Sequence, residues 1–282
     1  MNPKIGVIGG SGVYQIGGIE TPEWITVATP WGPPSDAILT GTLDGTEMAF
    51  LPRHGRGHVH SPTSVPYRAN IDALKRLGCT DIIAVSAVGS LRQDFRPGDF
   101  VLVDQFIDRT FAREKSFFGP GCAAHVSLAD PTCARLGQAV TQAAAGLTLH
   151  QNATYLTMEG PQFSTRAESR LYRTWGADVI GMTGMPEAKL AREAEICYAS
   201  LAMVTDYDCW HDGEAVDVAQ VIATLTANAA RAARVITALT LPERDTCPCG
   251  CDRALTHAIM TAPASRDPAV LARLDAVAGR VL

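Results

Sequence analysis

The sequence has no excess of positive charge, no long apolar segment and no secretion signal. Lys and Arg number 24 against 29 Asp and Glu, which gives a formal net charge of −5 at pH 7. Because nucleic acids are bound through clustered positive charge, this balance argues against a nucleic-acid partner. No run reaches the roughly 18 consecutive apolar residues of a membrane span, and the first residues contain no apolar core of a signal peptide. We therefore expect a cytoplasmic protein with no membrane partner.

Two nucleotide-binding signatures are incomplete. The apolar segment 4–8 is followed by Gly9-Gly-Ser-Gly12, but Gln15 stands where a dinucleotide fingerprint needs its third glycine, and no Gly-Lys-Ser/Thr ending follows. A dinucleotide-binding oxidoreductase is therefore a weak alternative. Glycines leave backbone N–H groups free to bind an anion. A loop that holds a small phosphate through its backbone and the Ser11 hydroxyl fits the segment better, and a purely structural turn is equally compatible with it.

Short apolar runs alternate with helical periodicity along the chain. The run 81–90 is apolar at nearly every position, which is typical of a strand covered on both faces. Asp44-Gly45 between two apolar runs predicts a hairpin. We expect a single α/β domain with a central mixed, largely parallel sheet flanked by helices. Residues 1–241 form its catalytic part, and residues 242–282 form a cysteine-containing tail with a short helix, packed on the same domain. The segment 107–130 is expected to be a long irregular loop. Strands are expected over 4–8, 38–43, 47–51, 81–90, 100–106, 151–158, 177–182 and 196–205, and helices over 67–77, 131–146, 183–195, 216–241 and 268–282.

One apolar run, residues 201–205, ends in a pair of acids, Asp206 and Asp208. Side chains two apart in a strand project to the same side. Both carboxylates would then face one pocket at the carboxyl edge of the sheet, where open α/β sheets bind ligands. The alternative is that one acid caps a following helix and the other is solvated.

The segment 52–60 combines Arg53 and Arg56 with three histidines, on a backbone broken by glycines. The planar guanidinium of arginine suits phosphate, so the segment predicts an anion site. The histidines suggest a metal site less well, because no carboxylate is arranged with them. A solvated basic loop is the remaining possibility.

The eight cysteines divide into five scattered residues and three in the tail. The five lie in or beside apolar segments, where a thiol acts as a small hydrophobe. In the tail, Cys247, Cys249 and Cys251 could bind zinc with His257 as the fourth ligand, but there are only three cysteines and no partner histidine at zinc spacing. Inert thiols and a redox-active tail are the alternatives. We expect no metal and no cofactor.

Seven segments, taken together and in order, resemble the trimeric nucleoside phosphorylase family, and within it the members that act on 5′-methylthioadenosine. The resemblance covers roughly residues 4 to 240. The segments are IGGSG (8–12), RHGR (53–56), VSAVGSLR (85–92), DQFIDRT (104–110), MEGPQFSTRAE (158–168), TWGADVIGMT (174–183) and ICYASLAMVTDYDCW (196–210).

The resemblance implies a reversible phosphorolysis in purine and methionine salvage. Inorganic phosphate, the co-substrate, attacks the ribosyl C1′ of S-methyl-5′-thioadenosine and releases adenine and S-methyl-5-thioribose 1-phosphate. It also implies a homotrimer with its sites at subunit interfaces. A purine nucleoside phosphorylase and a methylthioinosine phosphorylase are the nearest alternatives.

The resemblance also implies roles for individual residues. Met182 would lie against the ribose, Phe163 near the purine, and His125 would reach the 5′ pocket of a neighbouring subunit. Ser164 and Val218 would shape substrate choice. Asp206, Asp208 and His54 are the expected catalytic residues, and Asp206, Tyr207 and Asp208 would read the base. Phosphate would be bound by Ser11, Arg53, His54, Ser86, Ala87 and Thr183, where the two serines keep the hydroxyl of a threonine common in the family.

Donation of a proton to the leaving purine explains why an acid is needed. A protonated Asp206 could donate to purine N7 while its other oxygen accepts from the exocyclic amine. This requires a pKa raised by an apolar surrounding and by Asp208. An aspartate suits a 6-amino purine, whereas an asparagine would suit a 6-oxo purine. An apolar 5′ pocket that includes Val218 would favour a methylthio group over a hydroxyl, though only weakly.

Overall fold

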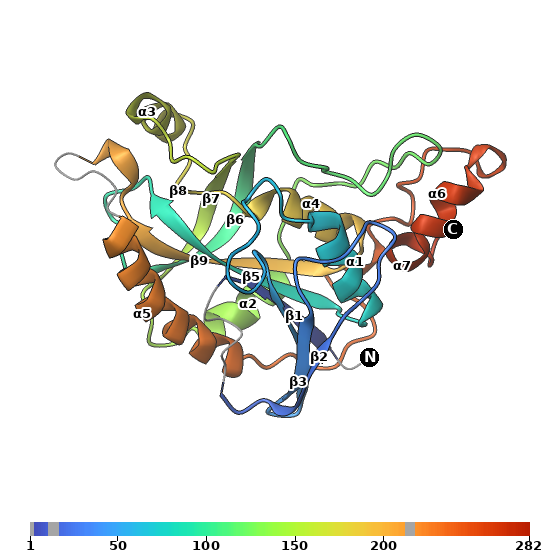
Figure 1. Ribbon diagram of the computed structural model, residues 1–282, viewed down its shortest axis with the longest axis horizontal. Coiled ribbons are helices and arrows are strands. Elements are labelled where there is room, and N and C mark those ends of the chain that lie inside the picture. The colour runs from blue at the N-terminus through green and yellow to red at the C-terminus, as the bar shows by residue number, and fades with distance from the viewer. Residues whose placement is uncertain (1–2, 11–16, 212–217) are drawn as a thin grey trace.

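Nine strands form one mixed sheet in the computed structural model, which describes residues 3–10, 17–211 and 218–282 (Figure 1). Of residues 218–220 it describes the backbone alone. The strands are β1 Lys4–Gly9, β2 Glu20–Ile25, β3 Ile38–Leu43, β4 Thr46–Pro52, β5 Asp81–Ser90, β6 Phe100–Arg109, β7 Leu149–Met158, β8 Val179–Gly181 and β9 Cys197–Asp206. The helices are α1 Tyr67–Arg76, α2 Ala134–Ala143, α3 Arg166–Thr174, α4 Gly184–Glu193, α5 Val218–Thr237, α6 Pro268–Arg273 and α7 Asp275–Ala278, with 3-10 turns at Asp208–Trp210, Cys251–Arg253 and Pro263–Ser265.

The sheet closes on itself around β5, which pairs with β1, β8 and β9. Strands β5, β8, β7, β6 and β9 form a ring, and β1 to β4 extend from it as an open wing. The register of the β5–β9 pair shifts between Val88 and Gly89: residues 81–89 pair parallel with β9, while Gly89 and Ser90 also pair antiparallel with β8. The mixed sheet and the β3–β4 hairpin are confirmed. The ring was not predicted.

Helices cover the sheet on both faces, as the doubly apolar strands predicted. Consecutive residues of β5 enter different cores: Ile82 packs in the cluster of α1 and α4, and Ile83 in the cluster of α2 and α5. Figure 1 shows these two helix pairs on different sides of the strands. Leu255 and Val277 of the tail are buried in the first cluster. Within the described residues, every helix is too short or too polar to span a bilayer.

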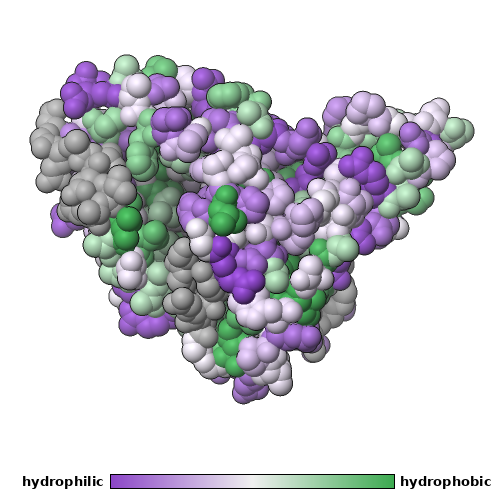
Figure 2. Space-filling model, viewed as in Figure 1, coloured by the Kyte–Doolittle hydropathy of each residue, from purple (hydrophilic) through white to green (hydrophobic). Residues whose placement is uncertain are grey.

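An outer lobe, formed by residues 117–126 and 255–282, stands out from the body of the molecule (Figures 1 and 2). The loop after β6 and the tail pair here through a bridge between Ala124 and Ile259 and through a hydrogen bond from His125 N to Ala258 O of 2.8 Å. We predicted that the irregular loop would begin at residue 107. Strand β6 instead continues to Arg109, because it pairs with β7 along that length.

Candidate active site

A cavity of about 380 Å³ lies at the carboxyl ends of β1, β4, β5, β8 and β9. This is the position at which open α/β sheets bind ligands, and the volume suits a small molecule. One part, the polar end, carries Arg53, His54, Ser86 and Thr183. Another, the acid end, carries Asp206 and Asp208. Nine predicted site residues line the cavity: Arg53, His54, Ser86, Ala87, Phe163, Met182, Thr183, Asp206 and Asp208.

Arg53 is buried under the polar end, with its charge offset by Glu187. The guanidinium donates to both Glu187 oxygens at 2.9 and 3.0 Å, to Val85 O at 2.8 Å and to Ile8 O at 3.3 Å. Among the described residues, the second hydrogen on Nη1 has no acceptor, so it is left for a ligand. Although burial opposes the charged form, Glu187 raises the pKa of Arg53. The sequence did not reveal Glu187, since a glutamate in a helix is usually solvated.

Two hydroxyl groups complete the polar end. Ser86 Oγ is buried and makes no hydrogen bond to any described residue. Thr183 is buried and directly precedes α4. A buried hydroxyl without a partner costs free energy, so a ligand acceptor at Ser86 would remove that cost.

His54 is neutral at pH 7. Burial, assisted by the charge of Arg53, lowers the pKa of His54 to about 4. Its Nδ1 lies 2.9 Å from His60 O, and a carbonyl only accepts, so Nδ1 carries the proton. Nε2 is therefore an acceptor, suited to an O–H of hydrogen phosphate or of a sugar. The ring stacks on His58, which also lines the cavity, with 4.2 Å between centroids.

The stretch between the two ends is mostly apolar. Met182 lies against Gly160, where an added Cβ would be 2.5 Å from the Met182 sulfur. Gly160 also has a φ of 70°, so this position favours glycine on two grounds. Phe163 is 54% exposed, so its ring is largely uncovered where it lines the cavity. Further apolar lining comes from Val88, Met158, Ile180, Met203, Val221 and Leu225.

Arg113, which no sequence motif singled out, holds this lining in place. Its buried guanidinium donates to the carbonyls of Met182 at 2.6 Å, Met185 at 2.8 Å and Glu159 at 2.6 Å. It also pairs with the Glu159 carboxylate at 3.0 Å. Arg113 thus fixes the ends of β7 and β8 from the loop that follows β6. Only the unusual length of that loop hinted at such a role.

Glu159 supports the same arrangement from the other side of the ion pair. Its carboxylate accepts from Thr63 Oγ1 at 2.6 Å and from the backbone N–H of Phe111 at 2.6 Å. Burial opposes ionisation, but these bonds and Arg113 together lower the pKa of Glu159 to about 2. The ion pair is therefore maintained at neutral pH.

At the acid end, a turn rather than strand alternation brings the two carboxylates together. Strand β9 ends at Asp206, and Asp208 adopts a left-handed φ of 53°. Our expectation of two strand positions was wrong in this respect, although both side chains line the cavity. Asp206 accepts from Thr205 Oγ1 and from Asp208 N, each at 2.8 Å. A Cβ on Gly89 would lie 3.0 Å from Asp206 Oδ1, so the glycine makes room for this acid.

Both acids have raised pKa values, and burial is the first cause in each. At Asp206, bonds from Thr205 and the Asp208 N–H oppose the shift. At Asp208, the charge of Asp206 adds to the shift. Asp208 Oδ2 is buried and has no partner among the described residues. Burial, and not Asp208, therefore raises the pKa of Asp206. The charge of Asp206, in turn, helps to raise the pKa of Asp208.

Tyr207, predicted to bind substrate, points away from the cavity. Its hydroxyl donates to Gln93 O at 3.4 Å, and its ring stacks on His211 with 4.6 Å between centroids. The residue that follows a strand-end acid faces the other side of the sheet, which accounts for the correction. Tyr207 contributes the backbone turn rather than its ring.

Two further predicted residues, Ser164 and His125, lie outside the lining. Ser164 is behind it, with its hydroxyl 3.6 Å from Met158 Sδ. His125 is exposed on the outer lobe. Ser11 lies outside the described residues, and of Val218 only the backbone is described.

Comparisons with known proteins place this geometry in context. The Phosphorylase superfamily matches residues 4–240. The S-methyl-5′-thioadenosine phosphorylase of Cereibacter sphaeroides is 68% identical, covering 100% of this chain and 99% of that protein. The protein of the same name from Rhodospirillum rubrum is 59% identical, covering 99% and 97%. Among solved structures, a methylthioadenosine phosphorylase from an antarctic soil metagenomic library has a TM-score of 0.90 at 46% identity, covering 98% of this chain and 99% of that one. The methylthioadenosine phosphorylase of Schistosoma mansoni in complex with adenine has a TM-score of 0.77 at 38% identity, covering 84% and 90%.

Proposed function

This chain belongs to the Phosphorylase superfamily, as its ordered motifs predicted, and we propose that it catalyses the reversible phosphorolysis of S-methyl-5′-thioadenosine. Phosphate attacks C1′, the bond from C1′ to purine N9 breaks, and adenine leaves with a proton. The products are adenine and S-methyl-5-thioribose 1-phosphate. The observation that carries the proposal is one cavity with a hydroxyl-rich polar end and, across an apolar stretch, two acids of raised pKa.

The polar end suits phosphate as nucleophile. Ribosyl transfer passes through an oxocarbenium-like state, which a nearby anion stabilises. Because Glu187 offsets Arg53, a bound phosphate would keep much of its negative charge. Ser86, Thr183 and Nε2 of His54 would orient it through hydrogen bonds, together with Ser11 and the backbone N–H of Ala87. Catalysis at this end is then mainly positioning.

The acid end suits a 6-amino purine. Burial raises the pKa of Asp206, so this carboxyl can hold a proton. Asp206 would donate this proton to N7, and the unpartnered Asp208 Oδ2 would accept from the 6-amino group.

The assembly we propose is a homotrimer in the cytoplasm, acting in purine and methionine salvage. His125 is exposed on the outer lobe and does not line the cavity of its own chain, which is compatible with a role in a neighbour's 5′ pocket. Light scattering should give the mass of a trimer. His125→Ala should raise KM for methylthioadenosine without dissociating that trimer, and a monomer of full activity would overturn this arrangement.

The decisive experiment measures phosphate-dependent base release from methylthioadenosine, adenosine, methylthioinosine and inosine. We expect the highest kcat/KM for methylthioadenosine. If no substrate is cleaved when phosphate is supplied, the proposal fails. Faster turnover of the two 6-oxo compounds would favour a purine nucleoside or methylthioinosine phosphorylase instead.

A further inference from the structure

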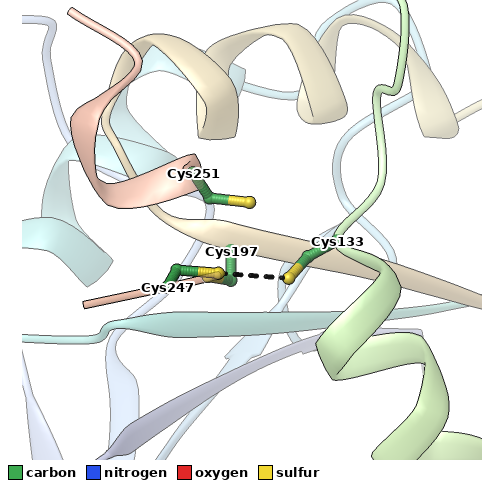
Figure 3. Close-up of side chains that lie close together, drawn as sticks. All are labelled: Cys133, Cys197, Cys247 and Cys251. Atoms are coloured by element: carbon green, nitrogen blue, oxygen red, sulfur yellow. Dashed lines mark hydrogen bonds between the residues drawn. The ribbon is translucent and has the colours of Figure 1, made fainter. Parts of the chain in front are cut away.

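Four cysteines from three distant parts of the chain meet in the interior, at the opposite end of β9 from the acids. Cys133 directly precedes α2, Cys197 is the first residue of β9, and Cys247 and Cys251 come from the tail (Figure 3). All four are buried, and their sulfur atoms lie within 4.8 Å of one another. Cys249, the remaining tail cysteine, is exposed.

The spacing of these sulfurs matches a tetrahedral metal centre. With Zn–S bonds of about 2.3 Å, the sulfurs of a Cys₄ zinc site are about 3.8 Å apart. The sulfurs of Cys133 and Cys247 are 3.7 Å apart. We propose that Cys133, Cys197, Cys247 and Cys251 bind a structural zinc ion.

The tail is shaped so that two of its cysteines face the same point. Three residues separate Cys247 from Cys251, a spacing found in zinc sites. Gly250 has a φ of 69° and its N–H donates to Cys247 O at 2.9 Å, which closes the turn. Cys247 N donates to Asp252 Oδ2 at 2.6 Å. The turn is thus held from both sides, as ligand loops of structural zinc sites are.

The surroundings carry positive charge suited to thiolates. Four thiolates and Zn²⁺ have a net charge of −2. Arg244 Nη1 lies 3.4 Å from Cys197 Sγ, and the Arg244 guanidinium also pairs with Asp81 at 3.0 Å. Arg135 pairs with the same carboxylate. Two guanidinium groups therefore lie beside the cluster, where positive charge stabilises thiolates, and the Asp81 and Asp252 carboxylates balance them.

The proposed zinc is structural because four protein ligands leave no position for water or substrate. It would join the tail to α2 and β9, segments that hydrogen-bond each other from Cys133 N to Tyr198 O at 2.8 Å. This reverses our expectation of no metal. It also changes the ligands that the tail suggested, since Cys249 and His257 are both exposed.

The first test is the metal content of untagged protein, purified under reducing conditions without chelator. Mass spectrometry of the metals should give about one zinc per chain. Cys251→Ser should lose the zinc. Cys249→Ser is the matched control, because it changes a cysteine in the same turn and should keep the full content. Replacement of zinc by Co²⁺ should give the intense visible bands of tetrahedral thiolate coordination.

Three results would overturn the proposal. Wild-type protein could contain no zinc and give no thiolate bands with added Co²⁺. Peptide mapping without reduction could find these cysteines joined as disulfides in freshly purified protein. Cys251→Ser could retain as much zinc as Cys249→Ser. If Cys251→Ser does not fold, the Co²⁺ spectra of the wild type and of Cys249→Ser still decide the question.

Discussion

At the polar end of the cavity a buried cation is matched by a buried anion, whereas at the acid end two carboxylates are buried together. Arg53 and Glu187 are each 2% exposed and lie 2.9 Å apart. Among the described residues, Asp206 and Asp208 have no ion-pair partner, and both have raised pKa values. An ion pair keeps both groups charged, while burial of an unpaired carboxyl raises its pKa and leaves a proton available. The first arrangement suits the holding of a ligand and the second suits proton transfer.

The largest effect should come from removing the available proton. Asp206→Asn should lower kcat/KM for methylthioadenosine by about 10²–10⁴-fold, the usual contribution of a general acid. The loss should be smaller for methylthioinosine, because an asparagine can donate to a 6-oxo purine. Steady-state kinetics on both substrates measures this, and an unchanged rate for methylthioadenosine would show that Asp206 is not the acid.

Breaking the matched pair should act on stability instead. Glu187→Ala would leave Arg53 as a buried charge without its partner and should lower the free energy of unfolding by about 3–5 kcal/mol. Glu47→Ala is the control, since it removes a 66% exposed acid that pairs with Lys4 at 3.3 Å and lies on strand β4, which leads to Arg53. That change should cost about 1 kcal/mol or less. Urea denaturation compares the two, and equal losses would contradict the distinction.

Asp208→Asn should have a smaller and more specific effect than Asp206→Asn. The substitution replaces a charged acceptor for the 6-amino group by a neutral amide oxygen, which should weaken transition-state binding by about 1–2 kcal/mol, the difference between charged and neutral hydrogen bonds. Adenosine and methylthioadenosine should lose activity by a similar factor, because they share the base. If only one of them is affected, Asp208 acts on the sugar side rather than on the base.

The pH dependence of stability should distinguish the acid end further. A carboxyl whose pKa is raised in the folded protein contributes stability that is present below its unfolded pKa and is lost as pH rises through the folded value. Asp206→Asn should therefore become more stable relative to the wild type as pH increases above about 4, with Tm as the readout. A constant difference in Tm across pH would contradict the raised pKa of Asp206.

The sequence predicted the acids and the basic loop because each follows an apolar strand, a pattern that local residues determine. It did not predict Glu187 or Arg113, because their partners are chosen by tertiary packing between segments far apart. Strand β2 was missed for a different reason: it is largely exposed and contains Pro22, so it has no apolar alternation. Tyr207 was misplaced because the whole segment 206–208 was assigned to the base, although alternation turns the residue after Asp206 to the other side of the sheet.

The cysteine cluster shows the same limit of sequence reading. Cys133 and Cys197 each looked like an isolated core thiol, and only the fold brings them beside the tail. Spacing along the chain therefore pointed to Cys249 and His257, which are exposed. Local spacing identifies a ligand pair, but it does not identify ligands that arrive from other elements.

The register shift in β5 has a consequence for the length of the ligand. Ser86 at the polar end and Gly89 beside Asp206 belong to the same strand, three residues apart. At about 3.3 Å per residue, the Cα atoms of Ser86 and Gly89 are about 10 Å apart along the strand. Strand β5 therefore sets how far apart the nucleophile, the sugar and the base can be bound. Rearrangement of loops can change what enters the 5′ side, but it cannot change this length.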